Sequence, residues 1–196
     1  MSIAALHAEF AAAKADARDL LAGISDPAFN WRRAPGTWSM AECLDHLVVV
    51  GHKYLRALDR AIEDGRSKNL VGAGPFRYGL LESWTVRAMD APPMFRVKAP
   101  RAFAPAGERR LEEALAAFIA LQDEFQKSLA RADGLDLRRV KARSPVSRHL
   151  KFSLGKAFAG ISAHQRRHLW QARQLRDDSA FPAGPGAAGE ARSAEP

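Results

Sequence analysis

Four long segments of the chain repeat apolar residues every three or four positions, which is the period of an α-helix. They cover residues 2–22, 40–63, 108–131 and 152–176, and no segment shows a convincing strand alternation. The third segment shows the helical pattern most clearly, at Leu111, Leu115, Phe118, Gln122, Phe125 and Leu129. Because four such helices bury their apolar faces best against one another, the sequence predicts an all-α four-helix bundle.

A long connection separates the second predicted helix, which we expect to end at Gly65, from the third. It covers residues 66–107 and carries five prolines, a residue type that interrupts helices. Residues 78–89 within it fit a short additional helix. A connection of this length is more often a lid or a pocket wall than an idle loop, and we expect that role here.

The chain of 196 residues suits one domain and a tail. We predict that residues 1–178 form the domain and that residues 179–196, rich in Pro, Gly and Ala, form a disordered tail.

One cysteine, Cys43, cannot form an internal disulfide. No apolar stretch approaches the ~20 residues of a membrane helix, and Glu9 and Asp16 interrupt any signal-peptide pattern. These features predict a cytoplasmic protein without a membrane partner.

The net charge of +8 favours acidic partners, because it leaves an excess of exposed cations. The arginines, however, are scattered in pairs, and neither a zinc-finger spacing nor an RNA-binding aromatic pattern is present. We therefore interpret the charge as a solvated arginine-rich surface and do not expect a nucleic-acid partner. A nucleic-acid-binding protein remains the third of three functional hypotheses.

The strongest chemical signal lies in the fourth predicted helix. His164 and His168 are one turn apart and share the apolar stripe of Ile161, where both imidazoles can reach one metal ion. Two core histidines bonded to carbonyls or to a carboxylate are the alternative, since buried imidazoles need partners. The spacing matches that of zinc proteases, but Gln165 stands where those enzymes need a catalytic glutamate, so a peptidase of that type is not expected.

A third histidine, His46, lies at the edge of the apolar stripe of the second predicted helix. Together the three histidines would form a site for a divalent cation, with a further coordination position open to water or substrate. Taken alone, His46 fits a rim residue better than a ligand. Cys43 precedes it by three residues, and we expect a packed core thiol there rather than a Cys-His nucleophile pair.

Two segments resemble motifs of the DinB-like (DinB/YfiT) superfamily. Residues 38–47, WSMAECLDHL, are similar to its W-S-x-x-E-x-x-x-H-L motif, and residues 163–172, AHQRRHLWQA, contain its H-x-x-x-H-L-x-Q motif. The resemblance extends over residues 1–178. The chain differs from the family pattern at Ser144-Pro145, where a His-Pro pair is common in the family. Ser39 and Glu42 also fit a helix-capping box, which we prefer to a catalytic role for Glu42.

The resemblance implies a four-helix bundle that holds a divalent metal, commonly zinc or nickel, through His46, His164 and His168. Iron and manganese are alternatives. Characterised relatives include transferases and isomerases that use low-molecular-weight thiols such as bacillithiol, mycothiol or glutathione. Family members are often dimers, and an outward-pointing Trp170 would suit a homodimer.

The leading hypothesis is therefore a metal-dependent enzyme acting on a small-molecule substrate. It would be either a thiol-dependent S-transferase or isomerase, or a hydrolase, and the sequence assigns no acid–base residue. The alternative is a non-catalytic helical module that binds metal or dimerises.

Overall fold

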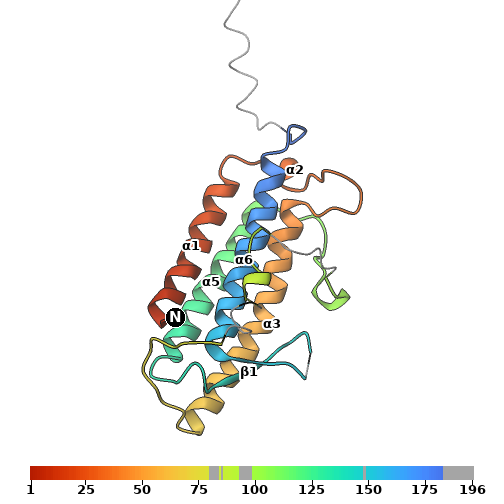
Figure 1. Cartoon of the computed structure of the whole chain (residues 1–196). Helices are drawn as coiled ribbons and strands as arrows, with labels where there is room; N and C mark the ends of the chain where they lie inside the picture. Colours follow the sequence, from red (N-terminus) through yellow and green to blue (C-terminus); the bar gives the residue numbers. More distant parts are fainter. Residues whose placement is uncertain (80–83, 85, 93–98, 148, 183–196) are drawn as a thin grey trace, which may run out of the picture.

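The computed structural model describes residues 1–79, 84, 86–92, 99–147 and 149–182. Its four long helices lie side by side in an elongated bundle, as Figure 1 shows, so the predicted all-α four-helix bundle is confirmed. These helices are α1 (Ile3–Leu21), α3 (Met40–Ser67), α5 (Leu111–Arg131) and α6 (Leu154–Arg176).

The packing of the helices decides which side chains can meet. Helix α3 packs against α5 and α6, and α1 packs against the same two helices. The helices that carry His46 and the His164–His168 pair are therefore neighbours. Inside the bundle, the Phe10 ring stacks on that of Phe125 with 4.7 Å between centroids. Each fully buried side chain of this size contributes roughly 1.5–3 kcal/mol.

The start of α3 is fixed by the capping box predicted from the sequence. The Ser39 hydroxyl accepts from the Glu42 amide at 3.2 Å, and the Glu42 carboxylate accepts from the Ser39 amide at 2.9 Å. Before it, the single-turn helix α2 (Asp26–Phe29) lies within the loop of residues 24–38. The cap holds Glu42 at the helix end, where it also forms an ion pair with Arg32 at 3.1 Å.

The end of α3 differs from the sequence-based expectation. The helix continues through Gly65 to Ser67. A Cβ atom at position 65 would lie 2.7 Å from Cγ2 of Val140. The glycine therefore permits close packing rather than helix termination.

A short antiparallel hairpin was not expected from the sequence. It pairs β1 (Lys141–Arg143) with β2 (Lys151–Ser153), and Ala142 lies opposite Phe152. Helix α6 therefore begins at Leu154, after β2, instead of at residue 152. Strands of three residues give too little alternation to be recognised in a sequence.

The predicted additional helix at residues 78–89 falls partly outside the described residues. Within this range the described residues 84 and 86–88 are helical. The 3-10 helix η1 (Arg101–Phe103) follows in the same connection. Most of the predicted tail, residues 183–196, also lies outside the described part, while Phe181 packs edge-on against Trp31. None of the helices in the described residues has the length and apolar character needed to cross a membrane.

Candidate metal centre

The structure brings the three predicted histidines together between α3 and α6. One ligand atom from each of His46, His164 and His168 lies within 4.8 Å of the others. The Nε2 atoms of His46 and His164 are 3.4 Å apart. Two nitrogens bound to one tetrahedral zinc ion at 2.0–2.1 Å are about 3.3 Å apart, so this separation fits a shared cation.

The orientation of His46 is set by a backbone carbonyl. Its Nδ1 atom lies 2.7 Å from the Phe103 oxygen. Because a carbonyl can only accept, Nδ1 carries the hydrogen, and the neutral ring presents the lone pair of Nε2 toward His164. Metal-binding histidines are commonly oriented by this kind of hydrogen bond.

His168 is held by an aromatic contact. Trp38 stacks on its ring with 5.6 Å between centroids, and the same indole lies 4.8 Å from the His46 ring. The Nδ1 atom of His168 is buried and makes no hydrogen bond within the described chain. A buried polar atom of this kind is costly, so this nitrogen is suited to a further partner such as a metal ion.

All three imidazoles are neutral at neutral pH. Burial, together with neighbouring histidines and Arg167, lowers the pKa of His164 to about 3 and that of His168 to about 2, while Gln171 opposes the shift of the His168 pKa. Burial also lowers the pKa of His46, while the Phe103 carbonyl and Asp45 oppose that shift. The neutral imidazole is the form that binds a cation, so the cluster needs no deprotonation first.

Part of the long connection is fixed beside His46. The buried Asp45 carboxylate accepts from the Ala106 amide at 2.7 Å and from Arg109 Nε and Nη2 at 3.0 and 2.7 Å. Lys53 donates to the Ala102 carbonyl at 2.6 Å. Residues 102–109 therefore lie against α3 next to the cluster, and their role as a pocket wall stays a prediction.

The other candidate residues lie elsewhere. Cys43 is fully buried, and burial together with Glu42 raises the pKa of its thiol, so the packed core thiol is the better interpretation. His7 contacts Gln126, while His52 and His149 are exposed. Trp170 is half-buried rather than fully exposed, and the homodimer stays a prediction.

Sequence reasoning missed three contributors to this site. The Phe103 carbonyl is a backbone group, which no side-chain pattern reveals. The pairing of Asp45 with Arg109 joins residues far apart in sequence, each of which alone resembles a surface charge. No ring contact was predicted for Trp38, although its place as the first residue of the W-S-x-x-E-x-x-x-H-L motif was the available signal.

Of three comparisons with known proteins, one gave a match. Searches among curated proteins and among solved structures gave no match. The family model described as the DinB superfamily matches residues 9–172, which include all three histidines, Trp38 and Asp45. The chain therefore belongs to the DinB superfamily.

Proposed function

We propose that the protein is a divalent-metal-dependent enzyme whose metal ligands are His46, His164 and His168. The observation that carries the proposal is the 3.4 Å separation of the His46 and His164 Nε2 atoms. They belong to a group of three neutral imidazoles in which His46 and His168 are buried and His164 is half-buried. Three imidazoles suit zinc or nickel, and they leave coordination positions open. The DinB superfamily match supports the same assignment.

The substrate class follows from what a three-histidine site offers. A bound zinc or nickel ion would supply Lewis-acid chemistry, lowering the pKa of a thiol or water or polarising a carbonyl. The chain's own contribution is orientation: the Phe103 carbonyl fixes His46, and Trp38 packs on His46 and His168. We propose either transfer or isomerisation with a low-molecular-weight thiol, or hydrolysis of a small ester or amide.

Metal binding is tested first with untagged protein that has been treated with a chelator. Titration with Ni²⁺ should quench tryptophan fluorescence, because Trp38 contacts two of the proposed ligands. Trp38→Phe should lose most of the quenching while still binding the ion in a calorimetric titration. If Ni²⁺ and Zn²⁺ both fail to bind the wild-type protein, the proposal is wrong.

Catalysis is tested by comparing metal-loaded and chelated protein on two small panels. One panel pairs glutathione, bacillithiol or mycothiol with an electrophile, and the other contains activated esters and amides. The proposal predicts turnover on one panel that disappears on chelation and returns with added metal. Tight metal binding without turnover on either panel would instead identify a non-catalytic metal-binding module.

A further inference from the structure

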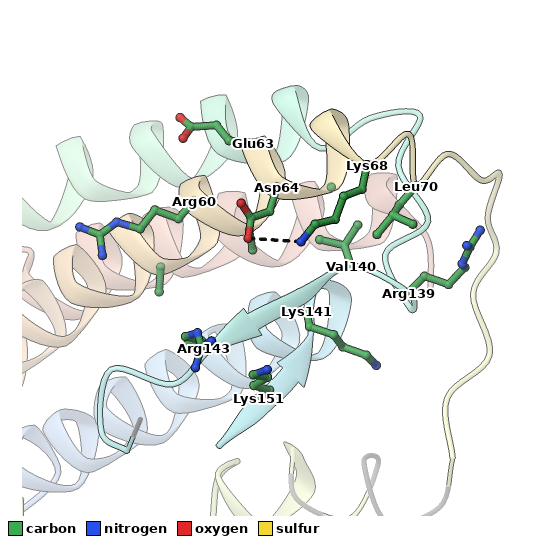
Figure 2. A pocket seen from close by; sticks show the side chains of 13 residues that line it. Arg60, Glu63, Asp64, Lys68, Leu70, Arg139, Val140, Lys141, Arg143 and Lys151 are labelled. Atoms are coloured by element: carbon green, nitrogen blue, oxygen red, sulfur yellow. Dashed lines mark ion pairs between the residues drawn. The ribbon is translucent and has the colours of Figure 1, made fainter. Parts of the chain in front are cut away.

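A half-open hollow lies at the end of α3 away from the histidines, where the helix faces the β1–β2 hairpin. Its volume is about 600 Å³, within the range of small-molecule sites. Two of its lining residues, Glu63 and Asp64, are acidic, and six are basic. The basic residues, all labelled in Figure 2, are Arg60, Lys68, Arg139, Lys141, Arg143 and Lys151.

The hairpin places like charges next to one another. Arg143 on β1 lies directly opposite Lys151 on β2, and both side chains are exposed. Lys141, two residues before Arg143, lies on the same face of β1 because strand side chains alternate. Like charges in directly opposed positions destabilise a strand pair. The hairpin therefore carries a repulsion that a bound anion would relieve.

The acidic residues do not neutralise this cluster. Asp64 forms an ion pair with Lys68 at 4.0 Å, and the Glu63 carboxylate points away from the hairpin in Figure 2. Within the described part of the chain, the side chains of Arg60, Arg143 and Lys151 form no ion pair or hydrogen bond. Their charges are available to a ligand.

The hollow is separate from the histidine cluster. Arg60 follows His46 by fourteen residues on the same helix, which corresponds to about 21 Å along its axis. None of the three histidines lines the hollow. A ligand here would therefore occupy a site of its own.

We propose that this hollow binds a small phosphorylated ligand carrying at least two phosphate groups. Guanidinium groups bind phosphate oxygens through paired hydrogen bonds, and more than one phosphate is needed to offset six basic and two acidic lining residues. A nucleic-acid backbone would favour a row of cations that continues along the surface, whereas these residues surround one bounded hollow. The small ligand therefore fits the arrangement better.

The test is calorimetric titration of the full chain with inorganic tripolyphosphate. It is done at physiological salt, which screens the attraction between the ligand and protein charges more than about 8 Å from it. We expect micromolar binding by the wild type and at least tenfold weaker binding by the double variant R143Q/K151Q. The matched control R18Q/R110Q removes two exposed arginines that do not line the hollow, so its affinity should stay within twofold. Arg110 follows Arg109, which binds Asp45 near the opposite end of α3. Any removal of metal by tripolyphosphate would be common to all three proteins.

Three outcomes would overturn the proposal. They are absence of wild-type binding at 1 mM tripolyphosphate, equal affinities of the wild type and R143Q/K151Q, and equal affinities for orthophosphate and tripolyphosphate. A single-stranded oligonucleotide that binds more tightly than tripolyphosphate, and is lost in the same variant, would also overturn it by assigning the hollow to nucleic acid.

Misfolding of the variant is distinguished by thermal unfolding. Because R143Q/K151Q removes a repulsive pair, its unfolding midpoint at low salt should be at least that of the wild type. A variant that binds weakly and unfolds at a lower temperature would contradict the role given to this pair.

Discussion

Each histidine of the cluster is controlled by a different neighbour. A backbone carbonyl orients His46, an indole packs on His168, and His164 faces His46 across 3.4 Å. Burial keeps all three rings neutral by lowering their pKa values. Ordinary packing and one hydrogen bond therefore hold three neutral imidazoles close together, an arrangement that could bind a cation without a charged ligand.

Cys43 provides a prediction at this scale. Its thiol is fully buried, so a thiol reagent such as dithionitrobenzoate should react with it only after unfolding. Burial raises its pKa above the ordinary value of 9.0. The unfolded chain therefore loses the thiol proton first, and stability falls as the pH rises above 9.

The expected loss is about 1.4 kcal/mol between pH 8 and pH 10. It is measured as the difference in the free energy of unfolding between the wild type and Cys43→Ala, which cancels the titration of other residues. Rapid labelling of the folded protein, or the same pH dependence in both proteins, would contradict the buried position of the thiol.

The grouping of the three histidines could be predicted in part from local helix spacing. His164 and His168 share a helix face because of the helical period. His46, which alone fits a rim residue better than a ligand, joined them through the resemblance of residues 38–47 to the DinB-like motif. The Phe103 carbonyl and the Asp45–Arg109 pair were not predictable, because they depend on the path of the chain between α3 and α5. The basic hollow was also missed, since it combines residues 57–70 with residues 139–151.

Among the structural elements, the junction of α3 with the hairpin depends on Gly65. Replacement by Ala would normally favour a helix by about 1 kcal/mol. Here the added Cβ would meet Val140, which is almost fully buried. We expect Gly65→Ala to destabilise the protein by about 1–3 kcal/mol in a urea titration. Ser67→Ala, at an exposed position of the same helix end, is the control, and a stabilised Gly65→Ala variant would contradict the packing.

The segment of residues 102–109 beside the histidines gives another prediction for an element. Asp45→Asn removes the charge that holds Arg109, which should loosen residues 102–109 and the Phe103 carbonyl that orients His46. We expect zinc affinity to fall about tenfold in a competition titration, as for other groups that orient metal ligands. Asp123→Asn, which breaks the ion pair with Lys14 on the opposite side of the bundle, should leave zinc affinity unchanged. Equal effects of the two variants would show that residues 102–109 do not position His46.

For the whole molecule, the site lies between two of the four main helices, so its occupancy should affect the stability of the bundle. A ligand that binds only the folded state at one hundred times its Kd adds about 2.7 kcal/mol. For a domain of this size we therefore expect zinc or nickel to raise the Tm of the chelated protein by roughly 5–10 °C. Scanning calorimetry with and without the ion measures the shift, and a Tm that does not respond would argue against a site within the bundle.

The most direct test of the metal centre is the metal content of untagged protein purified without a nickel column. Mass spectrometry should find about one zinc or nickel ion per chain in the wild type. His52→Ala, which changes an exposed histidine on the same helix as His46, should retain it, whereas His168→Ala should lose it. No metal in the wild type, even after zinc or nickel is added, or an unchanged content in folded His168→Ala, would contradict the three-histidine centre.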